Sequence, residues 1–207
     1  MNATGSISRA RWVALVAVWA AAAGAGMTAL AAYKSRPGPV GSEPAQWPVN
    51  SGIHRTPGLP TLVMFAHPMC PCTEASLAEL ARLMRRVDGK LSAHVLFIRP
   101  AGTPESWARS ANWKLAAQIP GVSVAADPDS AEAFRFGSGT SGEVVFSDAD
   151  GALRFSGGIT PARGHQGDNP GSDRIAALVA GGAEGFKGTP VFGCPLHDSE
   201  GLKEAVK

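Results

Sequence analysis

The sequence has few cysteines and no excess of charge of either sign. Only three of its 207 residues are cysteine, and 19 Lys and Arg residues stand against 17 Asp and Glu residues. Three cysteines are too few for a disulfide-stapled secreted scaffold. The near-neutral balance gives no reason to expect nucleic acid or a polyanionic surface as a partner. The length allows one core of about 150 residues with some chain to spare, which excludes a large multidomain enzyme.

One uncharged run is present, over residues 12–33. As a helix it would be about 33 Å long, enough to cross the hydrocarbon core of a bilayer. Secretory signal peptides have shorter apolar regions, so the length favours an uncleaved anchor, although Ala-Leu-Ala at 29–31 also resembles a cleavage site. We therefore expect a cytoplasmic stub at 1–11 and a single-pass protein of the inner (cytoplasmic) membrane. Its soluble part would face the oxidising periplasmic or other extracytoplasmic side.

The composition changes after the apolar run. Residues 34–57 are rich in proline and glycine, a composition that buries little apolar surface and predicts a tether. We expect the folded domain over residues 58–185. A C-terminal extension over residues 186–207 would carry Cys194.

The expected domain alternates between strand and helix patterns. The pattern predicts strands at 61–66, 91–98 and 122–126, helices at 73–87, 104–119 and 130–136, a hairpin of 143–147 and 152–156, and a last helix near 172–180. This order predicts an α/β fold with a mixed sheet between helices. The loops that follow the parallel strands would then share one edge of the sheet.

Two of the three cysteines follow the first predicted strand, as Cys70-Pro71-Cys72. Proline is favoured at the first position of a helix, which makes Cys70 the N-cap. Unpaired backbone N–H groups and the helix dipole there stabilise a thiolate and lower a thiol pKa. A Cys70–Cys72 disulfide would close a tight, easily reduced ring. The alternative is that both cysteines are small buried residues.

The order of strand, Cys-Pro-Cys, amphipathic helix, hairpin and final helix resembles the thioredoxin-like superfamily over residues 58–182. The runs HPMCPCTEASLAEL, FSGGITPARGHQGDNPG and GTPVFGCPL are similar to its membrane-tethered, periplasm-facing branch, which includes RedB-like and TlpA-like proteins. The resemblance implies a three-layer α/β/α fold and thiol–disulfide chemistry. This chain has Cys-x-Cys where the superfamily has Cys-x-x-Cys. Residues 136–142 contain no counterpart of the family's cis-proline, and the resemblance makes Thr140 its stand-in.

Other candidate site residues lie in loops of the same edge. The loop 157–171 would bring Arg163 and His165 close to the cysteines, where they could stabilise a thiolate or transfer protons; equally, both could be solvated on a long exposed loop. His67 stands three residues before Cys70, and it either faces the site or simply ends the strand. Cys194 is either a relay thiol or an unpaired one.

The sequence thus predicts a membrane-anchored thiol–disulfide oxidoreductase that acts on protein thiols and disulfides without a cofactor. Cys70 would attack the substrate sulfur, Cys72 would resolve the mixed disulfide, and Cys194 is a candidate relay. The sequence indicates neither a redox direction nor an oligomeric state.

Three alternatives use the same residues differently. A copper or zinc carrier would bind Cu(I) or Zn(II) through soft thiolate and imidazole ligands. Its candidate ligands are Cys70, Cys72, Cys194, His67 and His197. A peroxidase is indicated by the run Cys-Pro-Cys-Thr-Glu at 70–74, which faintly resembles the peroxiredoxin motif. The last alternative is a tethered interaction domain without catalysis.

Overall fold

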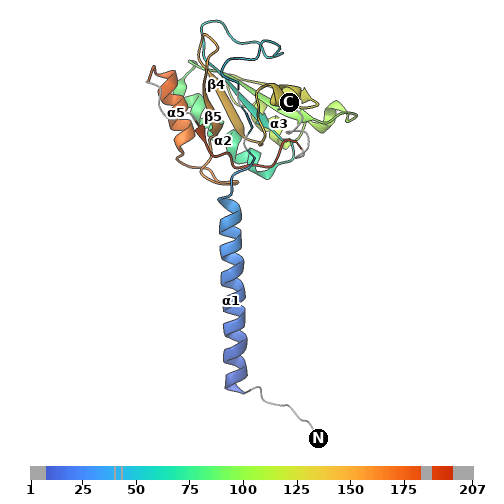
Figure 1. The fold of residues 1–207 in the computed structure, drawn as a ribbon, viewed down its shortest axis with the longest axis vertical. Coiled ribbons are helices and arrows are strands. Elements are labelled where there is room, and N and C mark those ends of the chain that lie inside the picture. Colours follow the sequence, from blue (N-terminus) through green and yellow to red (C-terminus); the bar gives the residue numbers. More distant parts are fainter. Residues whose placement is uncertain (1–7, 40, 43, 183–187, 198–207) are drawn as a thin grey trace. The chain divides into compact units, whose positions relative to one another are not determined.

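The protein is described by a computed structural model that covers residues 8–39, 41–42, 44–182 and 188–197. The chain divides into two units, Met1–Arg36 and Pro37–Lys207. In the first unit, helix α1 spans Arg9–Lys34 and buries none of its side chains (Figure 1). It is long and apolar enough to cross a membrane. The helix predicted for residues 12–33 is therefore confirmed, and it extends slightly at both ends.

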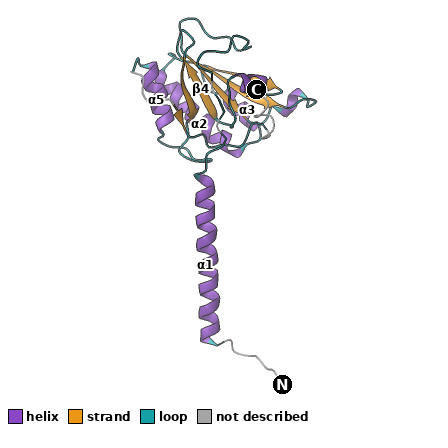
Figure 2. Ribbon diagram, in the orientation of Figure 1, coloured by secondary structure: helices purple, strands orange, loops and turns teal. Residues whose placement is uncertain are grey.

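The second unit is built on one mixed sheet of six strands in the order β3-β2-β1-β4-β5-β6 (Figure 2). Strands β1, β2 and β3 are parallel, β4 and β5 form an antiparallel hairpin beside β1, and β6 adds in parallel to β5. Their bounds are Thr61–Ala66, Ser92–Arg99, Val122–Pro128, Glu143–Ser147, Leu153–Gly158 and Gly188–Thr189. The mixed sheet and five of its strands agree with the sequence prediction; β6 was not predicted.

Helices cover both faces of this sheet. Strand β1 is fully buried, and its side chains alternate between two cores, with Leu62 and Met64 in one and Val63 and Phe65 in the other. Helices α2 (Pro71–Val87), α3 (Ala111–Ala117) and α5 (Pro170–Val179) cover the first core. The short helix α4 (Ala131–Arg135) lies on the second. The predicted three-layer α/β/α architecture is confirmed.

Two predicted helix boundaries were wrong, and capping residues explain both. The single helix expected at 104–119 is a short 3₁₀ turn, Glu105–Trp107, followed by α3. Ser110 caps α3 by accepting a hydrogen bond from the N–H of Trp113, so a new helix begins there. Helix α5 begins earlier than expected, because Asn169 accepts a hydrogen bond from the N–H of Ser172 at 2.8 Å.

The segment expected to be a free tether is partly docked on the domain. Trp47 donates its backbone N–H to Gly151 O at 2.9 Å, and Leu153 donates to Ala45 O at 3.2 Å. The Trp47 ring meets the ring of Phe136 edge-on at 4.9 Å. The physical reason is the second core: α4 has only five residues, so Trp47 supplies apolar cover that this helix cannot provide.

Replacing Trp47 with Ala should therefore destabilise the domain. We expect a loss of about 2 kcal/mol in the free energy of unfolding, from lost apolar burial and the lost aromatic contact. Urea denaturation of the full chain in detergent micelles measures it. Val49→Ala is the matched control, because Val49 is 98% exposed and its truncation should leave the midpoint unchanged. An equal shift in both variants would contradict the docking of this segment.

Candidate active site

Cys70 lies at the junction between β1 and α2. Its backbone is extended, with φ −78° and ψ 123°, and it is the N-cap of α2, with Pro71 in the first turn, as the sequence predicts. A turn after β1 brings it there: the Cys70 N–H donates to His67 O at 3.2 Å. Only 2% of the Cys70 surface is exposed. The fold therefore places this buried sulfur at the N-terminus of α2.

The second sulfur beside Cys70 belongs to Cys194 from the C-terminal extension. The two Sγ atoms are 2.8 Å apart and form a hydrogen bond. The Cys194 segment is held by the loop before β4: Ser141 N–H donates to Cys194 O at 2.8 Å, and Leu196 N–H donates to Gly139 O at 3.0 Å. Residues 124 positions apart in the chain thus meet at one site.

These contacts favour a negative charge on Cys70. Burial raises the pKa of the Cys70 thiol, but the hydrogen bond from the Cys194 thiol stabilises the thiolate and lowers the pKa. Backbone N–H groups of Cys194, Cys72 and Thr73 lower the pKa further. The net pKa of Cys70 lies below the ordinary value for cysteine, so of the three thiols Cys70 ionises most readily.

The contacts of the other two thiols favour their protonated forms. Burial raises the pKa of Cys72, and the charge and hydrogen bond of Cys70 raise it further. Burial and the same two effects of Cys70 raise the pKa of Cys194 to about 12. Arg163 opposes both shifts, because its positive charge favours the two thiolates. The site therefore combines one thiol with a lowered pKa and two thiols with raised pKa values.

Arg163 reaches the cysteines, whereas His165 does not. Arg163 donates from Nη1 to Gly193 O, next to Cys194, and it also hydrogen-bonds to Cys72. His165 is exposed, and its Nδ1 lies 2.7 Å from Arg163 O. It closes the turn that carries Arg163, since residues 162 and 165 form a β-bridge. In its described contacts His165 shapes the loop and meets no sulfur.

His67 and Thr140 support the site through backbone contacts. Nδ1 of His67 accepts the N–H of Met69 at 3.2 Å, its ring packs edge-on against Trp107 at 5.6 Å, and burial lowers the pKa of this imidazole. Thr140 is fully buried, and its hydroxyl donates to Pro39 O at 2.7 Å. A β-bridge to Pro195 places Thr140 beside the Cys194 segment, and its role as the stand-in for the family's cis-proline stays a prediction. Its described hydroxyl contact is with the chain before the domain.

Sequence reasoning missed three polar residues that build the site. Ser141 Oγ accepts the N–H of His67 at 2.9 Å and lies 2.9 Å from Thr73 Oγ1. Asn112 Nδ2 donates to the carbonyl of Cys70 at 3.2 Å. The carboxylate of Glu143, at the start of β4, is buried in the loop that holds Cys194. A charged residue opening an otherwise apolar strand was the one signal that could have identified Glu143; nothing local marks the other two.

In their described contacts, His67 and His197, the histidines of the metal-carrier alternative, do not meet the cysteine sulfurs. In the described ranges, no group of three or more His, Cys, Asp or Glu side chains has the arrangement of a metal site. The ring of His197 stacks on Phe134 at 3.9 Å, and its Nε2 lies 3.1 Å from Ser138 O. His67 uses Nδ1 for the loop N–H described above. These histidines therefore support loops in the structure.

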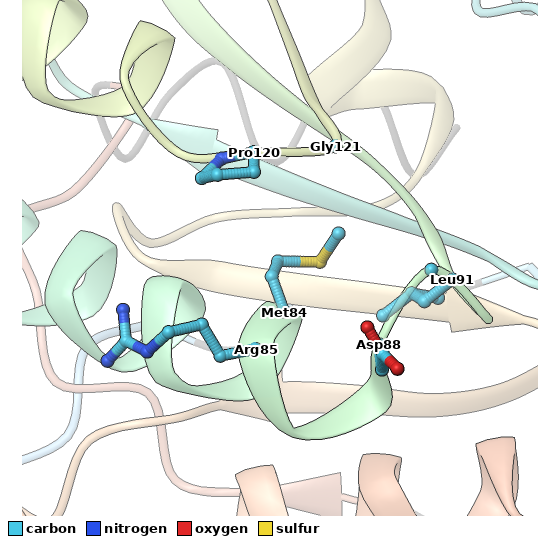
Figure 3. Close-up of a pocket in the computed structure, with 7 residues that line it drawn as sticks. Met84, Arg85, Asp88, Leu91, Pro120 and Gly121 are labelled. Atoms are coloured by element: carbon cyan, nitrogen blue, oxygen red, sulfur yellow. The ribbon is translucent and has the colours of Figure 1, made fainter.

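A surface pocket lies at the far end of α2 from the cysteines (Figure 3). It has a volume of about 320 Å³ and is lined by Met84, Arg85, Asp88, Gly89, Leu91, Pro120 and Gly121. Cys70 caps the N-terminus of α2, whereas this pocket adjoins its C-terminus, so about 25 Å of helix separates them. The thiol site is therefore distinct from this pocket.

Comparison with solved structures supports the fold. A hypothetical protein from Sinorhizobium meliloti has a TM-score of 0.57 at 21% identity, over 79% of this chain and 96% of that one. An uncharacterised conserved protein from Geobacillus kaustophilus has a TM-score of 0.56 at 20% identity, over 80% and 95%. A secreted Mycobacterium tuberculosis disulfide oxidoreductase homologous to E. coli DsbE has a TM-score of 0.41 at 16% identity, over 60% and 83%.

At these identities the likeness is one of fold. No protein-family model and no curated protein matches the sequence significantly. The mixed sheet with helices on both faces is an α/β fold that this chain shares with the S. meliloti and G. kaustophilus structures. Its membership of the thioredoxin-like superfamily stays a prediction from the sequence motifs.

The pKa order of the three thiols is testable by alkylation. Thiolates react with iodoacetamide and thiols do not, so as pH is raised Cys70 should be labelled at lower pH than Cys72 or Cys194. Cys194→Ala removes the thiol whose hydrogen bond lowers the pKa of Cys70 and should shift Cys70 labelling to higher pH. Cys194→Ser keeps a donor and should shift it less. Peptide-resolved mass spectrometry of the full chain measures all three; labelling of Cys194 before Cys70 would contradict the assignment.

Proposed function

We propose that this protein is a thiol–disulfide oxidoreductase whose nucleophile is Cys70. The observation that carries the proposal is the pairing at the N-terminus of α2: a buried sulfur with a lowered pKa lies 2.8 Å from a second thiol. Dithiol chemistry needs these two features, a thiolate to attack and a thiol in reach to resolve. The predicted membership of the thioredoxin-like superfamily is consistent with the proposal, but the sulfur geometry carries it.

The proposed reaction exchanges one disulfide for another. The Cys70 thiolate forms a bond to one sulfur of a substrate disulfide, the substrate S–S bond breaks, and the departing thiolate takes a proton. A second thiol of the chain then attacks Cys70 Sγ and releases the remaining substrate sulfur as a thiol. Two electrons and two protons pass to the substrate, and the chain is left with an internal disulfide. The reverse sequence would oxidise a substrate dithiol.

We also propose that α1 anchors the protein in the inner membrane and that Pro37–Lys207 lies on the extracytoplasmic side. The helix is uncharged over residues 12–33 and exposes all of its large apolar side chains, which in water would be unfavourable. On that side of the membrane, protein disulfides are the abundant partners for such a site. The substrates proposed are therefore extracytoplasmic protein thiols and disulfides.

The peroxidase alternative has less support from the contacts. In the run Cys-Pro-Cys-Thr-Glu, the Thr73 hydroxyl donates to His67 O at 3.2 Å and meets Ser141 Oγ. It therefore holds the loop and is not the donor to the Cys70 sulfur; the Thr73 backbone N–H is. The thiol neighbours of Cys70 favour exchange between sulfurs.

Disulfide exchange by the full chain in detergent tests the proposal. Reduced protein mixed with glutathione disulfide should lose two alkylatable thiols and regain them with dithiothreitol. Cys70→Ser removes the nucleophile and should slow this exchange by about a thousandfold or more. Lys114→Ala, on the surface of α3, is a control expected to exchange at the wild-type rate. Exchange by Cys70→Ser at the rate of the unaltered chain would refute the proposal.

In cells, acid quenching followed by alkylation reads the direction of the reaction. A reductant keeps the Cys70 site mostly reduced between turnovers, and an oxidant keeps it mostly disulfide-bonded. Thiols at the Cys70 site that stay fully reduced even in cells exposed to a thiol oxidant would contradict a redox function.

A further inference from the structure

We propose that Cys194, and not Cys72, is the resolving thiol, so that the oxidised form of the protein carries a Cys70–Cys194 disulfide. This inference rests on the proposed function, because it names the second sulfur of that reaction. It also gives the C-terminal extension a catalytic residue. Cys-Pro-Cys would then contribute one reacting sulfur, and the redox pair would join two distant parts of the chain.

The first support is the direction from which each thiol approaches. Cys194 comes from a separate segment, and its Sγ lies 2.8 Å from Cys70 Sγ. Cys72 also hydrogen-bonds to Cys70, but it stands only two residues away, in the first turn of α2, so a bond between these two sulfurs would close a tight ring. Bonding them would distort the turn whose N–H groups at residues 72 and 73 hold the Cys70 thiolate. The approach of Cys194 leaves that turn intact.

The second support is that the Cys194 segment is built to be held in place. Backbone hydrogen bonds from Ser141 and to Gly139 fix it against the loop before β4. Arg163 donates to the carbonyl of Gly193. A Cβ on Gly193 would lie 1.9 Å from Ser141 O, a distance that no side chain tolerates, so glycine is required for this close approach. Preorganisation of this kind favours fast attack on a neighbouring atom.

The third support is the change in the charges around Cys194 during the reaction. In the reduced protein the charge on Cys70 helps to keep Cys194 protonated. Once Cys70 is bonded to a substrate sulfur, that charge is gone, whereas the favourable effect of Arg163 on a Cys194 thiolate remains. Cys194 therefore becomes easier to deprotonate only when there is a mixed disulfide to resolve.

The resolving step balances without another reactant. The Cys194 thiol loses its proton, its sulfur bonds to Cys70 Sγ, and the bond from Cys70 to the substrate sulfur breaks. The released substrate thiolate takes the proton. Cys70 and Cys194 are oxidised together to a disulfide, the substrate gains the second of its two thiols, and Cys72 remains a free thiol.

Peptide mapping distinguishes the two candidate disulfides. Trypsin places Cys70 and Cys72 together on residues 56–82 and Cys194 on residues 188–203. The full chain in detergent is oxidised with stoichiometric glutathione disulfide, acid-quenched, alkylated and digested. The proposal predicts a cross-link between the two peptides with Cys72 alkylated. A loop within residues 56–82 with Cys194 alkylated would overturn it.

Single variants give an independent kinetic test. Cys194→Ser should accumulate glutathione on Cys70, with resolution slowed by at least about tenfold. Cys72→Ser should still form the link to Cys194. The opposite pattern, with glutathione accumulating on Cys72→Ser, would overturn the inference while leaving the proposed function standing. A wild-type chain that forms neither mixed nor internal disulfide would instead refute the proposed function.

A glycine pair tests the placement of Cys194 without removing a sulfur. Gly193→Ala should displace the segment and slow resolution by about tenfold, while Cys70 still takes up glutathione. Gly52→Ala is the matched control, because its nearest contact would be an ordinary 3.6 Å to Glu132. Thermal unfolding of both variants checks that the domain is folded. Wild-type resolution in a folded Gly193→Ala chain would contradict the requirement for this docking.

Discussion

The site depends on one buried carboxylate, that of Glu143, which is 1% exposed at the start of β4. Its Oε2 accepts hydrogen bonds from Ser138 Oγ at 2.9 Å and from the N–H groups of Gly139 at 3.0 Å and Thr140 at 3.4 Å, and its Oε1 accepts one from Ser156 Oγ at 3.3 Å. A buried charge is tolerated only with partners of this kind. Three of these donors are consecutive residues, 138–140. Glu143 therefore fixes the path of the loop that precedes β4.

Both halves of the thiol site are attached to that loop. On one side, Gly142 N–H donates to Phe65 O at 2.8 Å and His67 N–H donates to Ser141 Oγ at 2.9 Å, which ties the loop to the end of β1 just before Cys70. On the other side, Ser141 N–H holds the carbonyl of Cys194. The separation of the two sulfurs is therefore set by a few residues of backbone. Rigid support of this kind is what a reaction between two thiols requires.

The sequence predicted those parts of the fold that depend on local chemistry. Apolar runs located the five longer strands, and Pro71 located the start of α2. Both signals are local, because strand burial and the position of a proline at a helix start depend on only a few neighbouring residues. It failed where the outcome depended on distant partners. The sequence places Trp47 in a tether, whereas in the structure its ring packs against the ring of Phe136. The sequence also gives Cys194 no partner, because its contact with Cys70 depends on the loop at residues 139–141 that holds its segment. His165 was predicted in the right loop, but which side chain of a loop turns inward is decided by packing.

The small number of cysteines also has a physical consequence within the site. Three sulfurs share one neighbourhood with a single described guanidinium, that of Arg163, and thiolates in contact repel one another. Such a group titrates as a unit, and the first charge makes the second harder to form. The helix start gives that first charge to Cys70 through the N–H groups of residues 72 and 73, which no other cysteine shares. Backbone geometry therefore sets the order in which the three free thiols ionise, because the sulfur at the helix terminus is the one whose pKa is lowered.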